Sequence, residues 1–280
     1  MPVNRRHGWP PPKKSLGQVM LVDASVAREI VGALNLSENH NVLEIGAGRG
    51  ILTSFLLESG AETICCEIDE RMSVVLQHRF GGYPNFSLIS GDILKLDLNS
   101  IFLDESFGTV GNLPYHLTSE ILFKFFNYVR LAWDKGGSPR TEYLAVMVQR
   151  ELAERLLSSP GTRGWGVLSV YTSLFGEIEK VAEVSRDSFK PAPMVDSTVV
   201  KITFREGYPF EIEDYGLFRK LIKKSFGNRR KMLRNSLERF GIPDDSESNL
   251  GRRPEELTAA DFAALAAKIG KNEKYDHEKD

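Results

Sequence analysis

Four consecutive residues, Asn112-Leu113-Pro114-Tyr115, hold the most informative chemistry in this 280-residue chain. They follow an apolar stretch that ends at Gly111 and that we interpret as a strand. A proline directly after a strand stiffens the loop and releases its carbonyls from the sheet ladder. Asn112 then offers a side-chain acceptor, Leu113 a main-chain carbonyl and Tyr115 a flat ring. Together these groups predict a clamp for an amino group and a platform on which the base that carries it can stack.

The amino group of adenine is the reactant that such a clamp would serve. Its nitrogen is a poor nucleophile because the lone pair is delocalised into the ring. Two acceptors that hold its hydrogens, one from Asn112 and one from Leu113, favour a more tetrahedral and more nucleophilic nitrogen. No strong general base is needed, since the proton can leave after the new bond has formed.

A glycine-rich turn, Gly46-Ala47-Gly48-Arg49-Gly50, lies between a short apolar strand and a helix. Glycines let the backbone turn tightly and approach a ligand closely. The next strand ends at Glu67, where a carboxylate can accept hydrogen bonds from two ribose hydroxyls. The spacing is G-x-G-x-G and not the G-x-G-x-x-G of dinucleotide sites. Strand, turn, helix and acidic residue together predict a site for a nucleoside-bearing cofactor.

The third expected strand ends at Gly91-Asp92. A carboxylate at the carboxyl edge of a parallel sheet lies in the crevice where ligands bind. Asp92 could therefore accept a hydrogen bond from an adenine amino group. An aspartate that closes a turn or caps a helix explains the position equally well.

The elements that must position these groups alternate between apolar strands and amphipathic helices. Strands are expected at 42–45, 63–68, 86–89, 109–111, 143–148, 180–184 and 197–204, and helices follow Asp23 and cover 51–59, 70–80, 119–132, 150–157 and 167–175. This alternation predicts an α/β fold, a mostly parallel sheet with helices on both faces. Beyond residue 204 only helical periods occur, at 215–226, 231–240 and 259–269. We therefore expect a catalytic domain over 1–204 and a small helical domain over 205–280.

Composition excludes several classes of protein. The chain is 41% hydrophobic and 26% charged, as a soluble globular protein is and a disordered chain is not. Its two cysteines are adjacent, Cys65 and Cys66, which excludes a disulfide scaffold and favours a reducing, cytoplasmic location. No apolar run is long enough to span a membrane. The histidines are scattered without ligand spacing, so we expect no metal.

The formal net charge of −2 hides a strongly basic window over residues 219–234. It contains eight basic residues and no acidic one: Arg219, Lys220, Lys223, Lys224, Arg229, Arg230, Lys231 and Arg234. One interpretation is a solvated helix face. The other is a phosphate-contacting surface, because several Lys and Arg side chains together gain from counterion release on a polyanion. Arg5 and Arg6 near the N-terminus add to the second interpretation.

Over about residues 13–270 the chain resembles the ribosomal RNA adenine dimethyltransferases, which methylate an adenine amino group twice. The segment Lys13-Lys14-Ser15-Leu16-Gly17-Gln18 looks like the family's cofactor-covering segment. The family continues with Asn-Phe-Leu where this chain has Val19-Met20-Leu21. The family's asparagine touches the methionine portion of the cofactor. Val19 cannot form that side-chain bond, whereas a main-chain contact near Leu21 can survive.

The resemblance implies a Rossmann-like methyltransferase sheet that binds S-adenosylmethionine, followed by a small all-helical domain. It also implies that the loop with Gly46 and Gly48 approaches the methionine moiety and that Glu67 binds the ribose. Asp92 would bind the adenine of the cofactor, and Asn112 both cofactor and target. The sulfonium methyl group already carries positive charge, so in-line transfer needs alignment more than acid–base help.

Two further motifs resemble the same family. Phe189 to Ser197 is similar to its F-x-P-x-P-x-V-x-S loop, whose phenylalanine lies against the flipped base opposite the tyrosine. This resemblance implies that Tyr115 and Phe189 sandwich the target adenine. Phe226 to Leu237 resembles the family's F-x-x-R-R-K-x-L-R-N-x-L helix. The residues implied in RNA binding are Lys223, Arg229, Arg230, Lys231 and Arg234.

These matches imply dimethylation of the exocyclic amino group of adenines, two adjacent ones, in 16S-type RNA of the small ribosomal subunit. The expected partner is a pre-30S-like particle, with a role in small-subunit biogenesis, and nothing in the sequence demands more than a monomer. Three alternatives remain open. They are a large-subunit rRNA methyltransferase of the antibiotic-resistance type, a weakly active ribosome-assembly or transcription factor, and a small-molecule methyltransferase.

Overall fold

The computed structural model describes residues 10–237, 240 and 249–271. Arg5 and Arg6 lie outside the described residues. The chain divides into two compact units, one formed by residues 1–153 and 177–206 and the other by residues 154–176 and 207–280. Residues 154–176, expected in the catalytic domain, group in the structure with the C-terminal residues.

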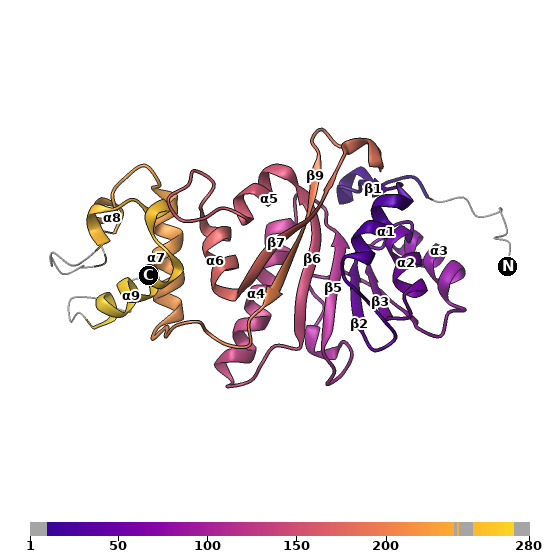
Figure 1. Cartoon of the computed structure of the whole chain (residues 1–280), viewed down its shortest axis with the longest axis horizontal. Helices are drawn as coiled ribbons and strands as arrows, with labels where there is room; N and C mark the ends of the chain where they lie inside the picture. Colours follow the sequence, from indigo (N-terminus) through magenta and orange to yellow (C-terminus); the bar gives the residue numbers. More distant parts are fainter. Residues whose placement is uncertain (1–9, 238–239, 241–248, 272–280) are drawn as a thin grey trace. The chain divides into compact units, whose positions relative to one another are not determined.

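A seven-stranded sheet forms the centre of the first unit, with strand order β4-β3-β2-β5-β6-β9-β7 (Figure 1). The strands are β2 Asn41–Ile45, β3 Glu62–Glu67, β4 Phe86–Ser90, β5 Phe107–Asn112, β6 Thr141–Gln149, β7 Gly176–Val184 and β9 Ser197–Phe204. The pairs β2–β3, β3–β4, β2–β5 and β5–β6 are parallel, and β6–β9 is antiparallel. The predicted mostly parallel α/β sheet is confirmed.

The order of the strands explains where a ligand can bind. The chain runs outward from β2 to β3 and β4 and then returns to β5 on the other side of β2. The connections from neighbouring strands therefore run in opposite directions at the carboxyl ends of β2, β3 and β5. In open α/β sheets such a point forms a crevice in which ligands bind. Glu67 ends β3 and Asn112 ends β5, so both lie at that edge.

The helices of the first unit follow the expected boundaries closely. They are α1 Ala24–Gly32, α2 Ile51–Glu58, α3 Glu70–Phe80, α4 Thr118–Asp134 and α5 Arg150–Leu156, the last of which runs into the second unit. Asp23 caps α1 by accepting from the main-chain nitrogen of Ser25. Asp69 caps α3 in the same way through Arg71. Short 3₁₀ turns occur at Lys14–Leu16, Leu98–Ser100 and Arg186–Ser188.

A second, two-stranded sheet joins segments far apart in the sequence. Strand β1 is Met20–Leu21, and it pairs antiparallel with β8, Phe189–Lys190, so that Leu21 lies opposite Phe189. The Val22 nitrogen extends this pairing by donating to the Ser188 carbonyl over 2.9 Å. The segment expected to cover the cofactor is thus tied to the F-x-P-x-P loop.

The second unit is helical. It contains α6 Val167–Phe175, α7 Tyr215–Gly227, α8 Leu233–Ser236 and α9 Ala259–Gly270, with 3₁₀ turns at Asn249–Gly251 and Pro254–Glu256. Buried apolar side chains of α7 and α9, including Phe218 and Phe262, form its core. Trp165 donates from its indole nitrogen to the Leu257 carbonyl over 2.8 Å.

The expectation of one helix over 231–240 is wrong at its start. Lys231 closes a turn by donating to the Asn228 carbonyl over 2.8 Å. Met232 is extended, with φ −63° and ψ 152°, so the helix begins only at Leu233. Residues 238–239 lie outside the described residues. The apolar periodicity does reflect burial, since Leu233 and Leu237 are buried. The turn that Lys231 closes keeps the residues before Leu233 out of the helix.

Candidate active site

A cleft opens at the carboxyl ends of β2, β3 and β5. It encloses about 720 Å³, including its opening to solvent. Residues 16–21 line it together with the glycine loop, the end of β3 and the loop after β5. The predicted site residues that it brings together are Val19, Leu21, Gly46, Gly48, Glu67, Asn112, Leu113, Pro114 and Tyr115.

The glycine loop requires glycine for steric reasons. Gly48 has a φ of +54°, and a Cβ there would lie 2.8 Å from the Met20 sulfur. Gly50 has a φ of +70°, and its Cβ would lie 2.4 Å from the Phe80 ring. Side chains at these positions would be strained in backbone and would collide with neighbours. The loop therefore follows a path, close to Met20 at Gly48 and to Phe80 at Gly50, that strongly favours glycine.

Glu67 is buried, and both of its carboxylate oxygens accept main-chain hydrogen bonds. Oε2 accepts from the Gly48 nitrogen over 2.8 Å, and Oε1 accepts from the Asp69 nitrogen over 2.9 Å. Burial raises the pKa of Glu67, against the lowering effect of these bonds. The two bonds orient the carboxylate between the glycine loop and the start of α3. Each oxygen retains acceptor capacity for a hydroxyl of a bound nucleoside.

Glu44 is a second buried carboxyl group at the cleft, and the sequence analysis gave it no role. It accepts hydrogen bonds from the Thr53 hydroxyl over 2.6 Å and from the Cys65 thiol over 3.2 Å. Burial raises the pKa of Glu44 to about 7. An acidic residue inside an otherwise apolar strand, two positions before the glycine turn, was the signal that could have identified it.

Asn112 is oriented by the N-terminal segment. Its Nδ2 donates to the Val19 main-chain carbonyl over 2.7 Å. Because a carbonyl can only accept, this contact fixes which end of the amide faces it, and Oδ1 is left as an acceptor. The Pro114 carbonyl already accepts from the Leu117 nitrogen over 2.9 Å and from the Thr118 hydroxyl over 3.1 Å. The acceptors that remain for the predicted clamp are therefore Asn112 Oδ1 and the Leu113 carbonyl.

Tyr115 is half-buried at the mouth of the cleft. Its hydroxyl shares a hydrogen bond of 2.8 Å with the hydroxyl of Ser197. Burial raises the pKa of Tyr115 above its usual value. The phenol therefore stays protonated at neutral pH, so it suits a stacking platform and not a general base.

Two of the residues predicted to bind the cofactor or the target base, Asp92 and Phe189, do not line the cleft. The Asp92 carboxylate accepts from the Leu94 nitrogen over 2.9 Å, as the turn interpretation requires. Its neighbour Gly91 donates to the Glu67 carbonyl over 2.8 Å, which places Asp92 beside the end of β3. The Phe189 side chain is only 2% exposed and packs in the core. Its ring presents no free face to a base in this structure, so the sandwich with Tyr115 is not preformed.

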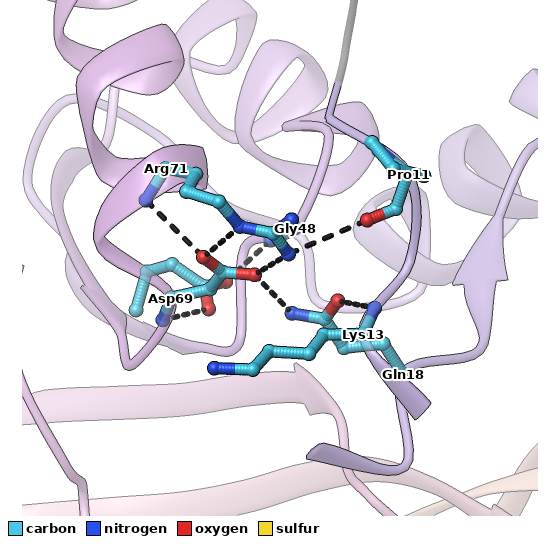
Figure 2. Close-up of polar contacts among 7 residues, drawn as sticks. Pro11, Lys13, Gln18, Gly48, Asp69 and Arg71 are labelled. Carbon is cyan, nitrogen blue, oxygen red and sulfur yellow. Dashed lines mark hydrogen bonds and ion pairs between the residues drawn. The ribbon is translucent and has the colours of Figure 1, made fainter. Parts of the chain in front are cut away.

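A polar network fastens the N-terminal segment to the start of α3 (Figure 2). Gln18 donates to the Asp69 carboxylate over 3.1 Å and accepts from the Lys13 main-chain nitrogen over 2.6 Å. Arg71 pairs with Asp69 over 2.6 Å and reaches the Pro11 carbonyl over 3.3 Å. The Arg71 guanidinium lowers the pKa of Asp69 to about 2. Sequence reasoning missed this network, because its members are separated by some fifty residues.

The basic residues of the second unit differ in their surroundings. Arg229 donates to the Arg163 and Thr162 carbonyls and forms an ion pair with Glu255 over 3.8 Å. Lys223, Arg230, Lys231 and Arg234 are exposed. Arg229 is therefore engaged within the unit, whereas the other four present their charges to solvent.

Among the described residues no group of three or more His, Cys, Asp or Glu side chains could hold a metal ion. In the same part of the chain, none of the helices combines the length and the apolar character needed to cross a membrane.

Comparison with known proteins places these features in a family. Residues 12–261 match the family described as ribosomal RNA adenine dimethylase. Two relatives are called ribosomal RNA small subunit methyltransferase A. That of Pseudomonas putida is 34% identical, with 92% of this chain and 94% of the relative covered. That of Oceanobacillus iheyensis is 36% identical, with 91% and 89% covered.

Two solved structures also superpose on this chain. A dimethyladenosine transferase from Plasmodium falciparum superposes with a TM-score of 0.73 at 25% identity, over 90% of this chain and 98% of that one. The 23S rRNA methyltransferase ErmE superposes with a TM-score of 0.66 at 24% identity, over 90% of this chain and all of that one, which shows the shared fold.

Proposed function

The chain belongs to the ribosomal RNA adenine dimethylase family, and from this premise we propose that it dimethylates adenines in the RNA of the small ribosomal subunit. It is a methyltransferase, its cofactor is S-adenosylmethionine, and its substrate is ribosomal RNA. The names of the two bacterial relatives favour the small subunit. The observation that carries the proposal is the orientation of Asn112, whose Oδ1 is left to accept from an amino group at the cleft.

The residues of the cleft fit this cofactor. A buried carboxylate at the end of β3 suits the ribose hydroxyls, and the loop containing Gly46 and Gly48 admits a ligand close to its backbone. Bound S-adenosylmethionine supplies an activated methyl group. The N-terminal segment, from Leu16 to Leu21, lines the cleft, where it is placed to shield a bound cofactor from water.

The remaining steps belong to the protein's own groups. Asn112 Oδ1 and the Leu113 carbonyl hold the two hydrogens of the target amino group and favour a tetrahedral nitrogen. The Tyr115 ring stacks on the base, a contact worth about 1–3 kcal/mol. That contact offsets much of the few kcal/mol needed to flip the base out. The proton leaves for solvent after transfer, so no residue acts as a strong base.

We assign the exposed basic residues Lys223, Arg230, Lys231 and Arg234 to RNA contact, and Arg229 to support of the same unit. Asp92 stays a proposed contact for the cofactor's adenine, and Phe189 a proposed second platform for the base. The proposed substrate is a pre-30S-like particle with two adjacent target adenines. The proposed state is a cytoplasmic monomer that acts in small-subunit biogenesis.

The decisive experiment incubates the purified protein with methyl-labelled S-adenosylmethionine and under-methylated ribosomal subunits, small and large separately. Mass spectrometry of RNA fragments then locates the product. We expect dimethyladenine in small-subunit RNA only. Label in large-subunit RNA would move the enzyme to the other branch. No label in either, with cofactor still bound in calorimetry, would favour an assembly factor.

A variant tests the stacking platform in the same assay. Tyr115→Ala removes the platform but no group at the sulfonium end of the cleft. It should lose methyl transfer and retain cofactor affinity. Lost cofactor affinity would contradict the assignment of this ring to the base.

A further inference from the structure

The Tyr115 hydroxyl forms a hydrogen bond with the hydroxyl of Ser197, which lies outside the loop after β5. Their oxygens lie 2.8 Å apart although the residues are 82 positions apart in sequence. Ser197 begins β9, where it lies opposite Gln149 of β6, and it is only 1% exposed. The contact thus connects the loop after β5 to the start of β9, which is two strands away in the sheet.

The position of Ser197 is held independently of the cleft. The carbonyl of its neighbour Asp196 accepts from the Arg150 main-chain nitrogen over 3.1 Å. The Asp196 carboxylate pairs with the Arg150 guanidinium over 3.2 Å and accepts from the Arg186 nitrogen over 3.1 Å. These contacts brace the start of β9 against β6 and α5. The backbone at Ser197 is therefore held in place, and its side chain is almost fully buried there.

A tyrosine ring that serves as a stacking platform must hold its plane. The loop of Tyr115 is fixed at its backbone through the Pro114 carbonyl, but the ring can still turn about its side-chain bonds. A hydrogen bond at the hydroxyl, the far end of the ring, removes that freedom. Phenylalanine at this position would offer the same stacking area without the restraint.

We propose that Ser197 is a positioning residue for methyl transfer, because its hydroxyl holds the Tyr115 ring in the plane that receives the target base. Ser197 acts through Tyr115 and touches neither cofactor nor reacting atoms. The inference rests on the proposed function, since it names what aligns the platform of that same site.

Kinetics of a double-mutant cycle test this role. Ser197→Ala and Tyr115→Phe should each lower the single-turnover methyl-transfer rate about 3- to 10-fold, as the loss of one buried hydrogen bond predicts. Cofactor affinity in calorimetry should not change. The double variant should be no slower than the slower single variant, because both substitutions break one contact. Additive losses, or no loss in Ser197→Ala, would overturn the proposal.

A matched control separates positioning from folding. Thr198 is adjacent on β9 and similarly buried at 3% exposure, but its side chain points to the opposite face of the sheet. Thr198→Ala should keep the wild-type rate even where the melting temperature falls. The rates are compared on whichever subunit the wild type methylates, so an error in the assigned subunit leaves this test intact.

A second measurement does not depend on activity. In protein labelled with ¹³C at the tyrosine Cζ, the Tyr115 signal is identified by its loss in Tyr115→Phe. Ser197→Ala should shift this signal and Thr198→Ala should leave it in place. An unmoved signal in Ser197→Ala would show that the hydroxyls are not bonded, and would overturn the proposal even for an inactive protein.

Discussion

The side-chain amide of Asn112 donates to the main-chain carbonyl of Val19 over 2.7 Å, across 93 positions of sequence. In the family motif that this segment resembles, asparagine occupies the position of Val19. Because the contact uses the main chain, the exchange of that side chain does not disturb it. The N-terminal segment therefore both lines the cleft and leaves Asn112 Oδ1 as the acceptor that we propose for the target amino group.

Asn112→Asp tests this orientation. A carboxylate cannot donate to the Val19 carbonyl, and its negative oxygen would be repelled by that carbonyl. We expect the methyl-transfer rate to fall about 10- to 100-fold, as loss of one or two such bonds predicts. Single-turnover assays measure this rate. Asn127→Asp on the exposed face of α4 is the control, and equal losses in both variants would contradict the role of Asn112.

Val19→Asn tests whether the valine at this position weakens cofactor binding. The new amide could contact the methionine portion of the cofactor while the main-chain carbonyl still holds Asn112. Cofactor affinity should rise about 3- to 10-fold, the effect of one added hydrogen bond. Calorimetry measures it, with Val19→Ala expected to change affinity little. A weaker complex in Val19→Asn would mean that the segment lies differently over the bound cofactor.

Gln18→Ala tests the fastening of the N-terminal segment. Loss of the Gln18–Asp69 bond should loosen the cover and speed cofactor release several-fold. Stopped-flow displacement measures the release rate. Lys13→Ala is a matched control, because Lys13 takes part only through its main-chain nitrogen. Equal release rates in wild type and Gln18→Ala would show that this network does not limit opening.

Glu44 predicts a specific dependence of stability on pH. Its folded pKa of about 7 lies above the ordinary value of 4.5. Between these values the folded state holds a proton that the unfolded state has released, so the free energy of unfolding falls as pH rises from 4.5 to 7. The slope approaches about 1.4 kcal/mol per pH unit. Above pH 7 Glu44 is ionised in both the folded and the unfolded state, so its contribution to the free energy of unfolding no longer changes with pH.

Glu44→Gln isolates this contribution. The variant keeps an acceptor for the Thr53 hydroxyl but cannot ionise. Chemical denaturation at several pH values should show the wild type losing stability relative to the variant between pH 5 and 7. Above pH 7 the difference should stay constant. Parallel curves over the whole range would show that Glu44 does not titrate in this interval.

Local signals predicted the elements well where cap and periodicity agreed. The helix expected over about 70–80 coincides with α3, because its apolar positions fall on one face, and the structure adds Asp69 as its cap. Glu67 and Asn112 could be placed at one edge, since both end parallel strands that flank β2. The pairing of β1 with β8 could not be predicted, because each strand has two residues and its partner is far away in the chain.

Within the site, too, residue types could be predicted from local sequence, whereas contacts between distant segments could not. Tyr115 could be identified by type and position, but its bond to Ser197 joins the loop after β5 to the start of β9, which only the folded sheet brings together. Phe189 was expected to face a base, and its burial follows from the pairing of β8 with Leu21. Charge counting treated Arg229 like its neighbours, because it could not reveal the carbonyls that Arg229 contacts.

The basic window gives the last prediction. Lys231 is exposed, and each phosphate contact on single-stranded RNA contributes about 0.7 to the slope of log affinity against log salt. Lys231→Ala and Arg230→Ala should each weaken RNA binding and flatten that slope by about this amount. Filter binding across a salt series measures it, and Lys135→Ala at the end of α4 controls for general charge.

Arg229→Ala should behave differently from its neighbours. Arg229 holds the carbonyls of residues 162 and 163 and pairs with Glu255, so its loss should lower stability by about 1 kcal/mol. Below the melting transition its salt slope should stay close to that of the wild type. If Arg229→Ala flattened the slope and kept full stability, its contacts within the unit would be secondary to RNA. If Lys231→Ala and Arg230→Ala left the slope unchanged, the window would be an ordinary solvated surface.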